Sequence, residues 1–222
     1  MISIILCTYN DAHFLPVALK SCISQPVEKE LILVDDCSTK PFPPEVDKLL
    51  NDFKVKVIRH DVNRGLSAAR NTGIEASKYS LIIPLDADDF FFPRSLRTLL
   101  SAVDDEHSIF YGNIVSAGGI GIPETGLLTR AKFLSDNPLF SSSLFKKEMW
   151  YNIGGYKVRV GAHYEDWNFW CRAYMAGYKF KYVPTIVYEH VERGDSMLRT
   201  LGVDKAKYVE IATEELKGAN IE

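Results

Sequence analysis

The sequence predicts an α/β fold in which a mostly parallel central sheet is flanked by helices. In residues 1–105, short apolar segments alternate with segments whose apolar residues recur every three or four positions, as in strand–helix–strand units. Polar residues directly follow each apolar segment. The composition, 46% hydrophobic and 25% charged over 222 residues, is that of a folded globular protein with a substantial core.

Strands and helices are expected to alternate throughout the first half. The strands are the apolar runs ISIILCT, ELILVDD, VKVIRH and LIIPLD, at 2–8, 30–36, 55–60 and 81–86. The helices are expected at 14–24, from Pro44 onward, at 67–78 and at 93–103. Pro44 suits a first helical turn, because the N–H that proline lacks would have no helical partner there.

The second half has a less regular pattern. We expect a strand at 108–115, a long loop at 116–126, a strand or short helix ending at Gly154–Gly155, a helix at 164–177, an extended segment at 179–191 and a terminal helix at 203–217. Pro184 should mark a break or a sheet edge. No low-complexity linker separates the halves, so 1–105 and 106–222 are expected to form one compact unit.

Several classes of protein are excluded by composition. No segment approaches the roughly 20 apolar residues of a membrane span, and the opening residues lack the basic flank of a signal peptide. We therefore expect a cytoplasmic protein without a transmembrane segment. The four cysteines form no CxxC pair, which favours reduced thiols. A net charge of -3 offers no positive field for nucleic acid.

Polar residues follow all four strands of the first half. Ligands of open α/β sheets bind at the edge where the carboxyl ends of parallel strands meet. The residues are Thr8, Tyr9, Asn10 and Asp11 after the first strand, Asp35 and Asp36 after the second, Asn63 and Arg64 after the third, and Asp86, Asp88 and Asp89 after the fourth. Each alone has an ordinary explanation, because Asp and Asn favour turns and helix N-caps. Asp36 could be such a cap, and Asp89 could cap the helix at 93–103.

The acidic cluster after the fourth strand predicts a cation site. Residues two apart in an extended segment face the same side, so Asp86 and Asp88 should point to the ligand edge while Ala87 points away. Paired carboxylates attract Mg²⁺ or Mn²⁺, which commonly complete their shells with substrate phosphates. Because no glycine-rich phosphate loop is present, we expect a nucleotide diphosphate held through the metal. Arg64 and Arg70 are candidate phosphate contacts, although Arg70 could equally lie on the surface.

Six motifs in order resemble those of the family two glycosyltransferases. They are ILCTYND, LVDDCS, NRGLSAARNTGI, IIPLDADDFFFP, NIGGY and YEDWNFWCR, and the resemblance covers nearly the whole chain to about residue 190. The resemblance implies the GT-A fold, a Rossmann-like mixed and mostly parallel sheet flanked by helices. It also implies an inverting, non-processive enzyme that uses Mn²⁺ or Mg²⁺ to move a sugar from a nucleotide diphosphate sugar, UDP-linked, to an acceptor hydroxyl.

The resemblance also implies donor-binding roles for individual residues. Asp36 matches the residue that hydrogen-bonds uracil, and Tyr9 matches the aromatic residue that stacks on the base, with Thr8 beside it at the same strand end. Arg64 matches a donor-site arginine. Asp86 matches an acid near the ribose and the metal. Residues 1–105 would thus form the donor-binding half.

The remaining matches concern the metal and the chemistry. Asp88 matches the direct metal ligand, Asp166 the general base, and His190 a histidine that reaches the metal or the diphosphate. A positioned carboxylate can deprotonate the acceptor hydroxyl as it attacks. By itself Asp166 could simply stabilise the start of a helix, His190 could be a packed polar residue, and Glu165 could support the site or face solvent. Residues 106–222 would carry the acceptor site, the base and the C-terminal helix.

Departures from the family pattern and rival functions remain. Cys7 stands where relatives often carry proline or serine, which bears on base selectivity, and the QxxRW motif of processive membrane-bound polymerases is absent. A sugar-nucleotide pyrophosphorylase would need a glycine-rich basic loop after the first strand, and a haloacid-dehalogenase phosphatase would carry its DxD there. A catalytically silent sugar-nucleotide-binding module is a third alternative, against which Asp86, Asp88 and Asp166 argue.

Overall fold

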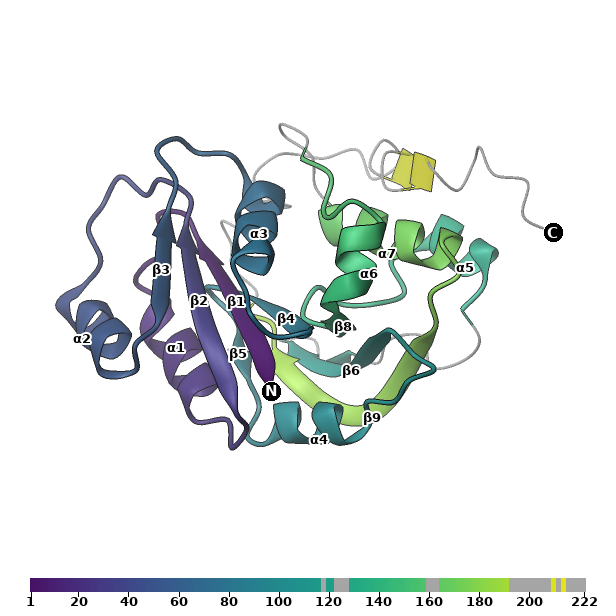
Figure 1. Ribbon diagram of the computed structural model, residues 1–222, viewed down its shortest axis with the longest axis horizontal. Helices are drawn as coiled ribbons and strands as arrows, with labels where there is room; N and C mark the ends of the chain where they lie inside the picture. The colour runs from purple at the N-terminus through teal and green to yellow at the C-terminus, as the bar shows by residue number, and fades with distance from the viewer. Residues whose placement is uncertain (117–118, 122–127, 159–163, 192–208, 211–212, 215–222) are drawn as a thin grey trace.

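A curled mixed sheet forms the centre of the computed structural model, which describes residues 1–116, 119–121, 128–158, 164–191, 209–210 and 213–214 (Figure 1). The strand order is β3-β2-β1-β4-β8-β6-β9-β5, with β7 beside β6. Its strands are β1 (Ile2–Thr8), β2 (Lys29–Asp35), β3 (Lys56–Arg59), β4 (Leu81–Asp86), β5 (Phe90–Phe91), β6 (Ile109–Ser116), β7 (Gly119–Gly121), β8 (Leu144–Lys146) and β9 (Phe180–Glu189). The helices are α1 (Leu15–Ile23), α2 (Pro44–Asp52), α3 (Leu66–Glu75), α4 (Ser95–Ser101), α5 (Arg130–Ser135), α6 (Lys147–Asn152) and α7 (Glu165–Met175).

The first half has the predicted parallel strand arrangement. β3, β2, β1 and β4 pair in parallel in that spatial order. The predicted strands and helices of residues 1–105 are all present, with ends that differ by a few residues. β5 was not predicted, because its two residues lie inside the FFF run that follows the acidic cluster.

Helices cover both faces of the sheet because the strands are apolar on both sides. In β1, Ile4 and Leu6 join the core beneath α1, α2 and α4, whereas Ile5 and Cys7 join the core beneath α3, α6 and α7. Figure 1 shows the second group of helices along the upper side of the sheet and the first along the lower side. Strands that are buried on both faces have continuous apolar sequences, and these strands could therefore be predicted from the sequence.

The sheet runs without interruption past residue 105. β4 of the first half pairs antiparallel with β8, β8 pairs antiparallel with β6, and β6 pairs in parallel with β9. Pro184 does not break β9, but it is exposed and lies on an open side of the strand, because β5 pairs only with Tyr188 and Glu189 among the described residues. The predicted edge position is thereby confirmed. The register shifts there, so Gly112 alone faces the stretch around Pro184; a Cβ on Gly112 would lie 2.6 Å from the Thr185 carbonyl oxygen. A bulge therefore accommodates the proline.

Other parts of the second half were only partly predicted. The segment ending at Gly154–Gly155 is both a strand, β8, and a helix, α6. The short helix α5 was not predicted, and β7 lies within the expected loop. The predicted terminal helix at 203–217 lies outside the described residues, except for 209–210 and 213–214, which are helical. Within the described ranges, no helix is both long and apolar enough to cross a membrane.

Candidate functional site

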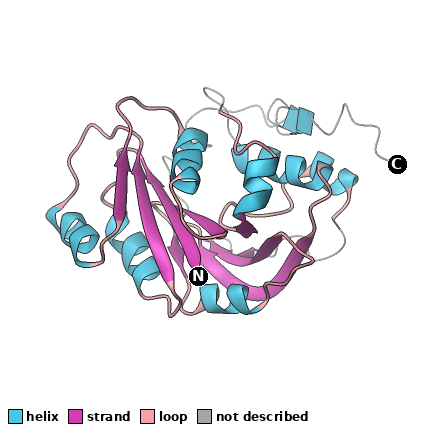
Figure 2. Cartoon of the chain, in the orientation of Figure 1, coloured by secondary structure: helices cyan, strands magenta, loops and turns pink. Residues whose placement is uncertain are grey.

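The carboxyl ends of β1 to β4 meet at one edge of the sheet, as the sequence predicted. Thr8 pairs with Asp35, Asp35 with Arg59, and Cys7 with Asp86, so the parallel strands end nearly level. Figure 2 shows these strands lying side by side. The predicted donor residues Thr8, Asp36 and Asp86 therefore lie at the same edge.

The loop after β1 leaves one aromatic ring exposed. Asn10 adopts a φ of 60°, donates its backbone N–H to Ser38 Oγ and accepts a hydrogen bond from the Thr39 N–H over 2.8 Å, which ties this loop to the one after β2. Tyr9 is 44% exposed beside these contacts. Thr8 Oγ1 is buried and has no hydrogen-bond partner among the described residues. The edge thus presents a planar ring and an unsatisfied hydroxyl.

Asp36 is buried and holds the turn that leads into α3. Its Oδ1 accepts the backbone N–H of Arg64 over 2.9 Å, and its Oδ2 accepts that of Gly65 over 2.7 Å. Gly65 has a φ of 84°, a conformation that favours glycine. Asp36 therefore caps this turn from the loop after β2, and it also fixes the backbone of the exposed Arg64.

His60 is part of this network, although it was not among the predicted site residues. Its Nδ1 lies 2.6 Å from Asp36 Oδ1 and its Nε2 lies 2.9 Å from Thr72 Oγ1. A carboxylate can only accept, so Nδ1 carries the proton. His60 directly follows β3 at the ligand edge, and that position was the signal that could have identified it.

Asp86 takes part in a buried ionic triad. Arg70 of α3 donates from Nη2 to Asp86 Oδ1 over 2.8 Å and from Nη1 to Glu165 Oε1 over 2.5 Å. Burial opposes the charge on Arg70, but the carboxylates of Asp86 and Glu165 hold the pKa of the guanidinium well above its usual value. Arg70 is 1% exposed, so the surface alternative is wrong. Glu165, for which two alternatives were open, does not face solvent: it is half-buried and paired with Arg70.

The acidic cluster after β4 lies in a turn, not in the extended segment that the prediction assumed, because β4 ends at Asp86 and the Asp89 N–H donates to the Asp86 carbonyl oxygen over 3.1 Å. Asp86 and Asp88 are half-buried at the ligand edge, whereas Ala87 and Asp89 are buried. Asp89 does not cap α4, because the N-cap residue of that helix is Arg94. Instead Asp89 Oδ1 lies 3.1 Å from His190 Nδ1 and accepts the Val191 backbone N–H over 3.1 Å. Asp89 therefore holds the imidazole of His190 in place.

These contacts change the proton affinities of Asp89 and His190. Burial raises the pKa of Asp89 to about 6, and the hydrogen bond from His190 partly offsets this effect. The hydrogen bond to Asp89 raises the pKa of His190. Among the described residues, no group of three or more His, Cys, Asp or Glu side chains is arranged to hold a metal ion by itself.

Asp166 lies in the first turn of α7, directly after Glu165 of the triad. Its Oδ1 accepts the Trp167 backbone N–H over 2.8 Å, and its Oδ2 accepts the side-chain amide of Asn137 over 3.0 Å. Burial, followed by the charge of Glu165, raises the pKa of Asp166 to about 7. A carboxyl group with this pKa can take up a proton near neutral pH.

A model of a known family matches residues 3–160, and its description is glycosyl transferase family 2. The chain belongs to glycosyl transferase family 2. The resemblance seen in the six motifs is thereby confirmed, and the chain is a glycosyltransferase. The pyrophosphorylase, the phosphatase and the silent binding module are set aside.

Two bacterial relatives of this family 2 glycosyltransferase match most of its length. It is 28% identical to the uncharacterized glycosyltransferase YwdF of Bacillus subtilis, over 96% of this chain and 83% of the relative. It is 29% identical to the succinoglycan biosynthesis protein ExoU of Rhizobium meliloti, over 88% of this chain and 63% of the relative. Thus the chain spans less than two thirds of ExoU.

Solved structures show the same GT-A fold. The S. aureus TarS 1–349 structure in complex with UDP-GlcNAc superposes with a TM-score of 0.81 and 20% identity, over 100% of this chain and 68% of that one. The mannosyltransferase PcManGT from Pyrobaculum calidifontis, in complex with GDP-Man and Mn2+, gives a TM-score of 0.76 and 18% identity, over 99% of this chain and 65% of that one. At these identities the likeness establishes the fold alone.

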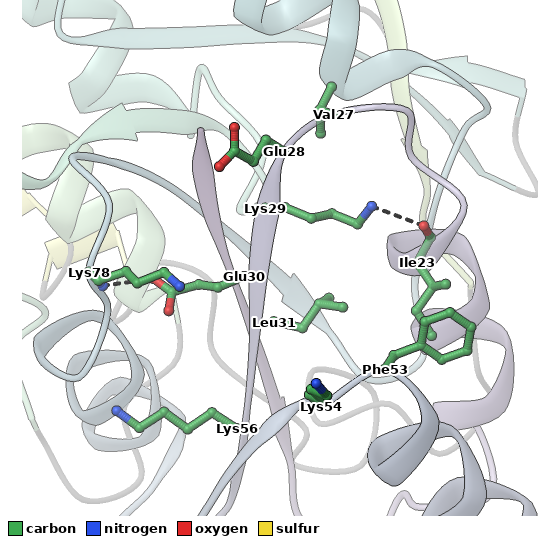
Figure 3. A pocket seen from close by; sticks show the side chains of 10 residues that line it. All are labelled: Ile23, Val27, Glu28, Lys29, Glu30, Leu31, Phe53, Lys54, Lys56 and Lys78. Atoms are coloured by element: carbon green, nitrogen blue, oxygen red, sulfur yellow. Dashed lines mark hydrogen bonds between the residues drawn. The ribbon is translucent and has the colours of Figure 1, made fainter.

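One cavity of this glycosyltransferase lies at the opposite end of the strands. It has a volume of about 620 Å³ and is lined by Ile23, Val27, Glu28, Lys29, Glu30, Leu31, Phe53, Lys54, Lys56 and Lys78. Figure 3 shows the Lys29 ammonium group directed at the Ile23 carbonyl oxygen, 2.9 Å away. Lys56 Nζ likewise donates to the Ala76 carbonyl. The cavity contains none of the predicted site residues, and two of its four lysines are engaged by backbone.

Proposed function

We propose that this glycosyltransferase moves a sugar from a UDP-linked donor to an acceptor hydroxyl, with inversion at the anomeric carbon and one addition per encounter. The observation that carries the proposal is Asp166, half-buried with a pKa raised to about 7, on a helix that Arg70 links to the ligand edge. Residues 1–105 supply the donor site in this proposal, and residues 106–222 supply the base and the acceptor site.

The donor base would bind between the loops after β1, β2 and β3. Asp36 accepts three hydrogen bonds from the protein, and a carboxylate has about four acceptor sites, so one remains for the imide N–H of uracil. The exposed ring of Tyr9 offers a stacking surface. Thr8 Oγ1 and the Arg64 guanidinium would contact the ribose or the diphosphate. TarS with UDP-GlcNAc supports a uracil base, whereas PcManGT with GDP-Man makes guanine the alternative to test.

The chemistry of the residues fits Mn²⁺ or Mg²⁺. Asp88 offers a hard carboxylate, and the hydrogen bond between Asp89 and His190 Nδ1 leaves Nε2 of the imidazole for a ligand, a pattern common around protein-bound metals. Asp88 and His190 would hold the ion together with the diphosphate, with Asp86 close by. When bound, the ion would neutralise charge that develops on the leaving diphosphate.

The reaction would then be a single displacement. Asp166 accepts the proton of the acceptor hydroxyl while that oxygen forms a bond to the anomeric carbon on the face opposite the diphosphate. The bond between the anomeric carbon and the diphosphate oxygen breaks, and its electron pair leaves with the nucleotide. Asn137 and the Trp167 N–H orient the carboxylate throughout. One base and one displacement invert the configuration.

A thermal-shift screen of nucleotides and nucleotide sugars with and without Mn²⁺ tests the donor assignment. A ligand present at 100 times its Kd stabilises the folded state by about 2.7 kcal/mol. We expect UDP and a UDP-sugar to raise the Tm in a Mn²⁺-dependent way, and GDP, ADP and CDP to raise it less. A larger shift with GDP would overturn the uracil assignment. Equal shifts with and without Mn²⁺ would overturn the metal assignment.

The stereochemical assignment requires a separate measurement. Proton NMR of the product formed from the donor identified in the screen reports the anomeric configuration. Inversion is expected, and retention would contradict a single displacement by Asp166.

A further inference from the structure

Arg70 connects the donor edge to the helix that carries Asp166. The side chain leaves α3, passes through the core, and donates to Asp86 at the end of β4 and to Glu165 in the first turn of α7. Asp86 and Glu165 are 79 positions apart in the chain and belong to different halves. One guanidinium therefore sets the separation between the two sides of the proposed site.

The surroundings hold the guanidinium in one position. Its side chain is 2% exposed, and its carbon Cζ lies 5.5 Å from the centre of the Tyr156 ring, which stacks on Phe169 of α7. The two ion pairs use different nitrogens, Nη1 and Nη2, so neither carboxylate can move without losing a charge-assisted hydrogen bond. Arg70 Nε and the Tyr156 hydroxyl have no hydrogen-bond partner among the described residues.

A purely structural role explains this arrangement poorly. Burying an ion triad costs desolvation free energy, and well-packed apolar side chains of similar volume often connect elements as stably. The planar guanidinium of arginine fixes two carboxylates at a set distance and direction, which apolar packing does not do. Both of these carboxylates lie at functional positions, one at the donor edge and one adjacent to Asp166.

We propose that Arg70 is a positioning residue for sugar transfer: it aligns Asp166, through Glu165, with the donor edge, through Asp86. This inference rests on the proposed function. Loss of the link misplaces the base relative to the anomeric carbon, and a displacement of about 1 Å can reduce turnover about 100-fold. Lysine cannot replace the fork, because one ammonium group at the end of a flexible stem does not span both carboxylates.

The test is a double-mutant cycle in kcat. Arg70→Met and Glu165→Gln are made singly and together, and steady-state transfer is measured with saturating acceptor. Arg70→Met should lower kcat about 10- to 100-fold. Glu165→Gln keeps the side-chain shape and an acceptor oxygen; it should lower kcat about 10-fold and change the donor KM less than about 2-fold. The cycle is measured well above pH 7, where Asp166 is ionised, because the charge of Glu165 also raises the pKa of Asp166. There the double variant should be no slower than Arg70→Met, because the positional effect of Glu165 on Asp166 requires Arg70.

Matched variants separate positioning from folding. Arg172→Met removes another buried arginine, which binds Asn168 and the backbone carbonyls of Ile153 and Gly155. It should lower the Tm without lowering kcat at temperatures where it is folded. Arg70→Lys should fold better than Arg70→Met but recover little of kcat. If Arg70→Met does not fold, the kcat of Glu165→Gln by itself tests whether the link between Arg70 and Glu165 is needed for transfer.

The outcomes distinguish this inference from the function on which it rests. A wild-type kcat in folded Glu165→Gln would overturn the positioning role and leave Asp166 as the base. The same holds if the fold-losses in kcat of the two single variants multiply in the double variant. Transfer that survives Asp166→Asn would instead overturn the proposed mechanism. A rise in donor KM without a fall in kcat would show that Arg70 serves donor binding alone, and would also overturn the inference.

Discussion

The side-chain amide of Asn137 donates a hydrogen bond to Oδ2 of Asp166 across 3.0 Å. Asn137 lies in the segment between α5 and β8, so a loop distant in sequence from α7 orients the carboxylate. Loss of this hydrogen bond is therefore expected to change the pKa of Asp166.

Asp166 should make activity dependent on pH near neutrality. Burial raises its pKa to about 7, so the proton-accepting form is lost as the pH falls through that value. The pH profile of kcat/KM, which reports groups of the free enzyme, should rise with pH and level off above its inflection. Asp166→Asn should abolish transfer at every pH while nucleotide binding, measured by calorimetry, is nearly unchanged. Residual transfer with the same inflection would point to another base.

The raised pKa of Asp166 also makes stability depend on pH, in the direction opposite to activity. The folded pKa of Asp166 lies above the ordinary value of 3.8 for an aspartate, so the folded state binds the proton more tightly and loses this contribution to stability as the pH rises from about 4 to 7. Asp166→Asn should therefore have a higher Tm than wild type above pH 7, and the difference should shrink toward pH 4. An equal difference at all pH values would show that the shift is absent.

Replacing Asn137 should move the inflection upward. Its amide N–H stabilises the ionised carboxylate, so Asn137→Leu should raise the pKa of Asp166 and shift the kcat/KM profile to higher pH. Asn152→Leu is the control, because the Asn152 side-chain amide donates to the Tyr178 hydroxyl in an exposed hydrogen bond that does not involve Asp166. A downward shift in Asn137→Leu, or identical profiles in both variants, would contradict the role assigned to the contact.

Metal-dependent nucleotide binding should depend on Asp88. Asp88→Ala should weaken UDP affinity in the presence of Mn²⁺ by about 10-fold or more and change affinity little after chelation with EDTA. Calorimetry with and without Mn²⁺ measures both values. Asp105→Ala, which alters an exposed aspartate outside the site, serves as the control. Equal loss of affinity in both conditions would show that Asp88 acts without a metal.

The Asp36 network should couple donor binding to stability. His60→Leu leaves a buried carboxylate short of one donor, which costs about 1–3 kcal/mol of unfolding free energy. It should also weaken UDP binding, because Asp36 fixes the turn that carries Arg64. Urea unfolding and calorimetry measure the two effects. His107→Ala, a control at a half-buried histidine whose ring contacts Asp104 outside the candidate site, should change neither by much. Stability that is lost without any loss of UDP affinity would separate His60 from the site.

The sequence by itself determined the first half of the fold and the edge of the sheet at which the candidate site lies. Strands covered by helices on both faces must be apolar at every position, and parallel strands must place their carboxyl ends at one edge. Both constraints leave a pattern in consecutive residues. Strands such as ISIILCT and LIIPLD, and the polar residues after them, could therefore be predicted from the sequence. Asp36, Asp86 and Asp88 lie at the predicted edge for this reason.

Only the tertiary structure decided which polar groups meet. Arg70 resembled a surface or phosphate-binding residue in sequence, yet it is buried between Asp86 and Glu165. Asp89 resembled a helix cap, yet it holds His190 from 101 positions away in the chain. Such pairings depend on how β4, α3, α7 and the end of β9 pack against one another. No local pattern encodes them, because a hydrogen bond requires only donor and acceptor within about 3 Å, whatever their separation in sequence.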